Sequence, residues 1–216
     1  MSDDVFSDPD GTREEILAAT YRCLRDEGYA DLTINAIGEE FEKSPSLVYR
    51  HYDSKDDLVI ACLGYMLERF ERQLVDEAIT DPRGRLERFI EWASSDDIPA
   101  ERRQFLSTLV ELRTRAVYDE AYRCYFTRSD EVFVRYVSDM IQAGIDQGRF
   151  QECEPDGVAE TLVTLLHGAM NRRPTHEGEA WLGDVRDELE AYLEARVYSD
   201  STEGASESDE NDRSQL

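Results

Sequence analysis

Apolar residues recur every three or four positions along most of this chain, and this spacing restricts its fold more than any other feature. Ile16, Leu17, Thr20, Cys23 and Leu24, for example, fall on one side of a helix. The sequence has no long alternating run rich in Val, Ile and Thr, and it contains only 12 Gly and 6 Pro. The pattern predicts an all-α protein, and 216 residues are enough to bury a substantial core.

Capping residues and helix breakers divide the pattern into segments. We expect Thr12 to cap a first helix that ends near Gly28, Thr33 to cap a short second helix, and Ser44 to cap a third that starts with Pro45. A long helix should follow from Lys55 toward position 79, and then helices at about 83–95, 99–115, 118–147, 155–172 and 179–198. The ends, 1–11 and 199–216, are polar with little to bury, so we expect both to be disordered.

Acidic residues outnumber basic residues by 49 to 24, which gives a formal net charge of −25. This charge alone argues against nucleic-acid binding, because phosphate contacts need basic residues. The acid is spread over every segment, however, and all basic residues except Lys43 and Lys55 are arginines. Proteins of salt-accumulating cytoplasms have such carboxylate-rich surfaces, so we expect a halophilic archaeal source. An acidic protein from an ordinary cytoplasm is the alternative.

The sequence contains no familiar catalytic or metal-binding motif. Its four cysteines lie far apart without a CxxC pair, which favours reduced thiols inside a cell. The histidines are His51, His167 and His176, and no HExxH, P-loop, GxGxxG or GxSxG occurs. No apolar run reaches membrane-spanning length, and the first residues do not form a leader. We therefore expect a cytoplasmic protein that is not an enzyme and needs no cofactor or metal, with a distributed catalytic site as the alternative.

The stretch from Thr33 to Tyr52 has the form of two short helices joined by a tight turn, the unit that places a helix in the DNA major groove. It contains Val48-Tyr49, His51-Tyr52 and then Ser54-Lys55-Asp56-Asp57-Leu58, and Gly28-Tyr29 and Leu32-Thr33 precede it. Together these motifs resemble the N-terminal signature of the TetR family, without a gap, over residues 12 to 66. Two departures are Glu42 and Ser46, which stand where the family usually has glycine.

The resemblance implies a transcriptional regulator, usually a repressor, that binds double-stranded operator DNA. Val48 and Tyr52 are expected to pack inside, and Arg50 could instead pair with a nearby carboxylate. An acidic protein-interaction module without DNA binding is the alternative function. The residues expected to contact bases or phosphates are Thr33, Lys43, Ser44, Pro45, Ser46, Leu47, Tyr49, Arg50, His51 and Lys55.

The resemblance also implies a helix-turn-helix DNA-binding domain at 12–54, joined to a larger helical domain at 55–198 that forms a homodimer and binds a small-molecule effector. The apolar faces predicted for the dimer interface contain Leu162, Leu165, Leu166, Met170, Trp181, Leu189, Tyr192 and Leu193. The predicted pocket contains Phe89, Trp92, Phe105, Leu109, Tyr122, Tyr125, Phe126, Phe133, Tyr136, Met140 and His167. For both sets, ordinary packing in the core of one protomer is the alternative.

Overall fold

The computed structural model describes residues 6, 9–41, 45–75, 78–95 and 97–199. Its regular elements are helices, apart from one isolated bridge between Phe150 and Tyr198. The helices are α1 (Thr12–Asp26), α2 (Gly28–Asp31), α3 (Ile34–Glu40), α4 (Pro45–Val48), α5 (Lys55–Val75), α6 (Pro82–Ser94), α7 (Ala100–Arg115), α8 (Glu120–Asp146), α9 (Pro155–Arg172), the 3₁₀ turn η2 (Arg173–Thr175) and α10 (Trp181–Arg196). The all-α prediction is confirmed. Across the described ranges, no helix is both long and apolar enough to cross a membrane.

The first helices begin only partly as the sequence predicts. Thr33 is confirmed as the N-cap of α3, because its hydroxyl accepts a hydrogen bond from the Ala36 amide at 3.0 Å. Thr12 is not a cap, since it is the first residue of α1 and follows Gly11, whose φ is 87°. Ser44 lies outside the described residues. The short α2 was not expected, because a single turn is too short to show apolar periodicity.

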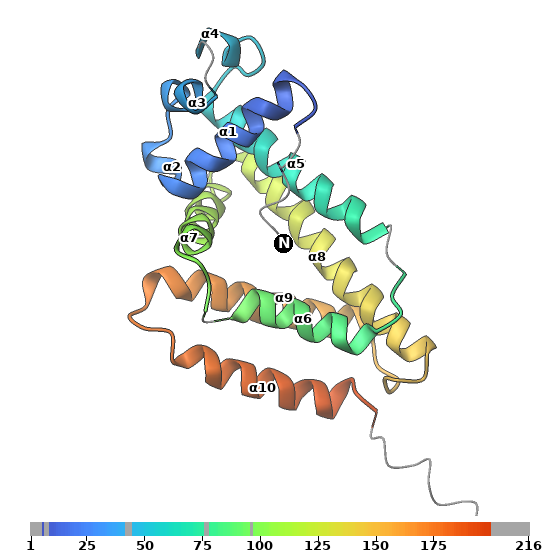
Figure 1. Ribbon diagram of the computed structural model, residues 1–216. Helices are drawn as coiled ribbons and strands as arrows, with labels where there is room; N and C mark the ends of the chain where they lie inside the picture. Colours follow the sequence, from blue (N-terminus) through green and yellow to red (C-terminus); the bar gives the residue numbers. More distant parts are fainter. Residues whose placement is uncertain (1–5, 7–8, 42–44, 76–77, 96, 200–216) are drawn as a thin grey trace, which may run out of the picture.

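The helices form two groups that are linked by long elements (Figure 1). Helices α1 to α4 gather at one end of the molecule, while α6, α9 and α10 lie roughly side by side at the other. Helix α8 runs between the two ends and packs against α5, α6, α7 and α9. Helix α7 lies between the groups and packs against α1 and α2 on one side and α8 and α9 on the other.

Two buried apolar clusters hold these groups together. The first joins α1, α3 and α4 to the N-terminal half of α5 and also includes Phe105, Leu112, Tyr122 and Phe126 from α7 and α8. The second joins α6, α8, α9 and α10. Phe6 packs against the first cluster, with its ring stacked on Tyr21 and Tyr65, so the expectation that 1–11 has little to bury fails at this residue.

Candidate nucleic-acid interface and the cavity connected to it

Close packing between α3 and α4 defines the angle of the candidate reading helix. A Cβ added to Gly38 in α3 would lie 2.8 Å from Pro45 Cγ and 3.2 Å from Pro45 Cα. Side-chain carbon atoms do not normally approach so closely, so glycine is required for this contact. Gly38 received no role from the sequence alone, although its position four residues after Ile34 places it on the inner side of a short amphipathic helix.

The outer side of α4 and the turn after it carry exposed side chains that could reach DNA. Ser46, Arg50 and His51 are exposed, and Tyr49 is 60% exposed although it is a large aromatic residue. No carboxylate among the described residues forms an ion pair with Arg50. Pro45 and Leu47 are half-buried, and Leu47 packs against the first cluster. Lys43 and Ser44, which the sequence also assigned to this surface, lie outside the described residues.

The packing predicted for this segment is also present. Val48 is completely buried, and Tyr52 is half-buried against the first cluster. The amides of His51 and Tyr52 both donate to the Val48 carbonyl at 3.0 Å, which continues the α4 backbone turn as far as Tyr52. Val48 thus anchors the helix while the neighbouring side chains remain outside.

Lys55 does not present its charge outward as the sequence predicted. Its Nζ donates to the Tyr29 carbonyl at 2.8 Å and to the Leu32 carbonyl at 2.9 Å, and it lies 4.0 Å from the centroid of the Tyr29 ring. Burial lowers the pKa of Lys55. The Tyr29 carbonyl also accepts the Leu32 amide at 3.3 Å, and carbonyls at the C-terminal end of a helix attract an ammonium group. Thr33, in contrast, is exposed, and it is itself the N-cap of α3.

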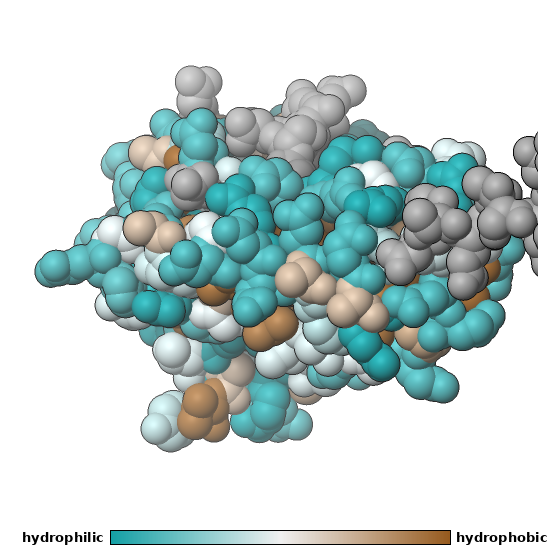
Figure 2. Space-filling view, turned by 90° about the horizontal axis from the view of Figure 1, so that it is seen from below, coloured by the Kyte–Doolittle hydropathy of each residue, from teal (hydrophilic) through white to brown (hydrophobic). Residues whose placement is uncertain are grey.

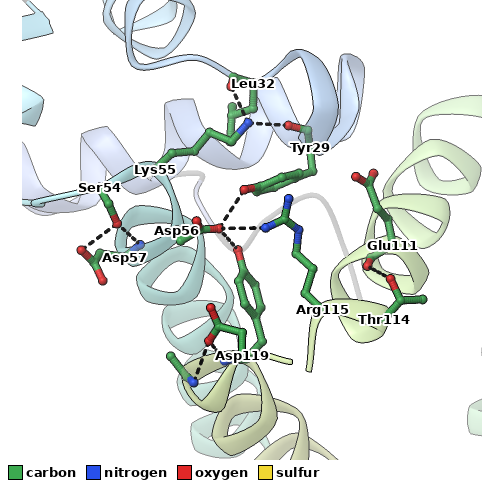
Figure 3. Close-up of polar contacts among 12 residues, drawn as sticks. Tyr29, Leu32, Ser54, Lys55, Asp56, Asp57, Glu111, Thr114, Arg115 and Asp119 are labelled. Atoms are coloured by element: carbon green, nitrogen blue, oxygen red, sulfur yellow. Dashed lines mark hydrogen bonds and ion pairs between the residues drawn. The ribbon is translucent and has the colours of Figure 1, made fainter. Parts of the chain in front are cut away.

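Asp56 connects the α1–α4 group with α7 and α8 (Figure 3). Its Oδ1 accepts hydrogen bonds from the Tyr29 hydroxyl at 2.8 Å and the Tyr122 hydroxyl at 2.7 Å, and it lies 3.6 Å from Arg115 Nη1. Burial opposes ionisation, but the two hydroxyl groups and the charge of Arg115 outweigh it and lower the pKa of Asp56. The pKa of Tyr29 rises to about 12 through burial and its bond to this carboxylate.

A cavity of about 940 Å³ lies among α1, α5, α6, α7, α8 and α9. Helix α7 contributes one continuous stripe to its wall, Arg102, Phe105, Leu106, Leu109 and Arg113, at helical spacing. Helix α5 adds Leu63, Met66, Leu67 and Phe70. The volume falls in the usual range for small-molecule sites. The cavity is therefore built on α5 and α7, which also contact the candidate DNA-binding end.

The structure brings most of the predicted pocket residues together, but not all of them. The cavity wall contains Phe89, Trp92, Phe105, Leu109, Tyr125, Phe126, Phe133 and His167. Tyr122, Tyr136 and Met140 lie outside it, which corrects the sequence prediction. Tyr122 turns toward Asp56, Tyr136 packs against the second cluster and accepts a hydrogen bond from Arg85, and Met140 is fully buried in that cluster. Aromatic content alone could not separate cavity wall from solid core.

The residues predicted for the dimer interface divide between the inside and the outside of the protomer. Leu162, Leu166, Leu189 and Leu193 are buried in the second cluster, so within the protomer they already have a partner. Leu165 is 45% exposed, while Met170, Trp181 and Tyr192 are half-buried, and Met170 also lines the cavity. The outward side of α9 carries Thr161, Thr164, Leu165 and Gly168, all exposed and uncharged.

Comparison with known proteins agrees with this arrangement of two parts. Residues 16–62 match the family described as bacterial regulatory proteins, tetR family, and residues 82–197 match the C-terminal domain of the BetI-type transcriptional repressor. A TetR transcription regulator from Haloarcula marismortui has a similar solved structure, with TM-score 0.73 and 36% identity over 86% of this chain and 97% of that chain. The transcriptional repressor AcnR of Corynebacterium glutamicum is 24% identical over 87% of this chain and 95% of its own length.

These matches and the exposed helix-turn-helix define a DNA-binding transcriptional regulator. The chain belongs to the TetR family. Its relatives are regulators of transcription, and the alternative of an acidic protein-interaction module is not favoured. A putative regulator from Saccharomonospora viridis, solved in complex with choline, has the same fold, with TM-score 0.67 and 21% identity over 87% of this chain and 98% of that chain.

Proposed function

We propose that this protein represses transcription by inserting α4 into the major groove of an operator. The observation that carries the proposal is the pattern of α4 and the turn after it, in which Val48 is buried while Ser46, Tyr49, Arg50 and His51 are exposed. Arg50 is suited to a guanine edge or a phosphate, and Tyr49 to the sugar-phosphate backbone. Thr33, at the N-terminus of α3, is placed for a phosphate contact.

A small-molecule effector in the 940 Å³ cavity would release the operator. Such a ligand can shift the protein only if it binds the released state more tightly than the DNA-bound state. The structure supplies a route for this preference, because α5 and α7 line the cavity and also carry Asp56 and Arg115, which contact Tyr29 beside the reading head. Movement of either helix would disturb these contacts and change the position of α4.

The operator is read by a homodimer, with one α4 from each protomer in successive major grooves. The outward side of α9 supports this proposal, because four exposed residues without charge follow one another at helical spacing in a chain with 49 acidic residues. Figure 2 views the molecule with α10 nearest and shows hydrophobic residues in small patches within a largely hydrophilic surface. The acidic surface and arginine-rich basic residues further support a protein that works at high ionic strength, in a halophilic cell.

Selection of genomic DNA by the purified protein tests the proposed function. Fragments retained in high salt are sequenced, and a gel shift then compares the wild type with the Tyr49→Ala and Arg50→Ala variants on the enriched site. We expect one enriched sequence with two half-sites about 10 base pairs apart, or a multiple of this distance, and weaker binding by both variants. Retention of fragments without a common sequence, or equal binding by all three proteins, would rule the proposal out.

A further inference from the structure

The charged groups in the cavity wall differ in how fully they are neutralised. Arg25 forms hydrogen bonds to Asp26 at 2.6 and 3.0 Å, and Arg113 forms two bonds to Asp130 at 3.0 and 2.6 Å. His167 lies 3.8 Å from Asp130, and burial together with the charge of Arg113 lowers the pKa of His167, which favours the neutral ring. These groups therefore bring little unpaired charge to the cavity.

Arg102 is the exception among the described cations of the cavity wall. Its guanidinium is half-buried, donates a hydrogen bond to the Trp92 carbonyl and lies 4.7 Å from the centroid of the Trp92 ring. Within the described ranges it has no carboxylate partner, although the chain has about two acids for every base. Glu101, its acidic neighbour along α7, also lines the cavity, but it is exposed and forms no ion pair with Arg102 among the described residues. Burial and the nearby charge of Arg173 lower the pKa of Arg102.

Trp92 forms the cavity wall beside Arg102. Its indole Nε1 is buried and has no hydrogen-bond partner among the described residues. A half-buried cation without a counter-ion is unfavourable unless a ligand supplies the missing negative charge. Arg102 lines the cavity whereas the Trp92 Nε1 atom is fully covered, so a negatively charged group in the cavity would be bound by Arg102.

The rest of the cavity indicates the shape of such a ligand. Between Arg102 and Arg113 the stripe of α7 is apolar, and the two arginines lie eleven positions apart, which corresponds to about 16 Å along a helix. Aromatic rings from α6 and α8, including Phe89 and Phe133, face this stretch across the cavity. The site thus combines one end that carries Arg102, with the exposed Glu101 next to it, and a long apolar wall.

We propose that the ligand of this cavity is an anionic amphiphile, a carboxylate on an extended apolar body, whose carboxylate binds Arg102. The inference deepens the proposed function and rests on it for the regulatory role of the cavity. A quaternary ammonium ligand, such as the choline bound to the Saccharomonospora viridis regulator, would place its positive charge beside an unneutralised guanidinium. The sign of the ligand charge therefore distinguishes this chain from that structural neighbour.

Calorimetric titration of the full-length protein with three eight-carbon probes tests the proposal: octanoate, octan-1-ol and octyltrimethylammonium. Wild type should bind octanoate at least tenfold more tightly than octan-1-ol and should not bind octyltrimethylammonium. Arg102→Gln should abolish this preference, and Arg102→Lys should retain it. Arg103→Gln is the matched control, because the neighbouring Arg103 is exposed, pairs with Glu179 and does not line the cavity. It should bind octanoate within twofold of wild type.

Binding of the cationic probe as tightly as octanoate, binding of none of the three, or full octanoate affinity in Arg102→Gln would overturn the proposal. If Arg102→Gln does not fold, as judged by circular dichroism, the comparison of the three probes on wild type still tests whether the cavity prefers an anion. The same samples are assayed for operator binding. Octanoate that binds through Arg102 without weakening operator binding would confirm the ligand class and refute effector release, whereas intact operator binding without any octanoate binding would refute the ligand class alone.

Discussion

Gly38 shows how a single missing side chain determines the geometry of the reading head. A glycine in a helix interior makes the helix less stable than an alanine would by about 1 kcal/mol, so the presence of Gly38 in α3 needs a reason. The reason is steric, because Pro45 occupies the space that a Cβ would fill. Gly38 allows α4 to pack closely against α3, and this packing sets the position of α4 for DNA binding.

We predict that Gly38→Ala destabilises the protein by about 1–3 kcal/mol, since α4 must move away to accept the methyl group. Operator affinity should fall at least tenfold. Gly64→Ala is the control, because Gly64 lies inside α5 with no atom within 4 Å of the added Cβ, and it should stabilise by about 0.5–1 kcal/mol. Urea unfolding measures both changes. A Gly38→Ala protein as stable as Gly64→Ala would show that the contact with Pro45 is not restrictive.

A second prediction for a single residue concerns Asp56 and the pH dependence of protein stability. Its pKa in the folded protein lies below the ordinary value of 3.8, so its ionised form stabilises the fold. This contribution is complete above pH 3.8 and disappears as the pH falls through the folded-state pKa. Asp56→Asn should therefore be less stable than wild type by about 1–2 kcal/mol at pH 7, with some loss to solvent screening because the side chain is partly exposed. At pH 2 the difference should be smaller than at pH 7. An equal difference at both pH values, measured by urea unfolding, would contradict the role of its charge.

At the scale of elements, the sequence predicted the helices well and their partners less well. The apolar spacing and the breakers placed α6 to α10 within about three residues of their observed ends. In α9, the same spacing correctly identified Leu162 and Leu166 as one apolar face, but that face belongs to the core of the protomer. Periodicity shows which side of a helix avoids water and does not show which element covers it.

The site was predictable to a similar extent. Val48 and the exposed residues around it follow from the motif, since a recognition helix needs one inward and one outward side. The sequence predicts a phosphate contact for Lys55 and no role for Asp56 or Arg102, because their partners, such as the Leu32 carbonyl and the Tyr122 hydroxyl, lie far away in the sequence. A residue type at one position carries no information about such tertiary partners.

For a single element, we predict that the outward side of α9 is needed for dimerisation. Leu165→Arg should convert a dimer into a monomer, because a charge without a partner in a protein interface costs several kcal/mol. Val117→Arg serves as the control, since Val117 is 66% exposed outside α9 and should leave the dimer intact. Sedimentation velocity of the three proteins measures the result. A Leu165→Arg protein that sediments like wild type would place the dimer contact on another face.

For the whole molecule, a charge of −25 must coexist with binding to polyanionic DNA. Ordinary basic DNA-binding proteins release cations from DNA, and their affinity falls steeply as salt rises. Here, cations must gather between the acidic surface and the phosphates, which offsets that release. We predict that log affinity falls less steeply with log salt than one unit per phosphate contact, and that it could rise at the highest salt. Anisotropy titrations from 0.1 to 3 M KCl, a range of about thirtyfold, measure the slope. A steep negative slope throughout would contradict the proposed high-salt adaptation.

The central claim is that the exposed side of α4 reads an operator sequence, and fluorescence anisotropy with the enriched operator and a scrambled duplex tests it most directly. Wild type should prefer the operator by at least a hundredfold, which corresponds to about 3 kcal/mol. Arg50→Ala should lose about 1–3 kcal/mol of operator binding. Arg128→Ala, which changes an exposed arginine of α8 paired with Glu71, should bind like wild type. Equal affinity of wild type for both duplexes, or an Arg50→Ala protein that binds the operator as tightly as wild type, would contradict the account.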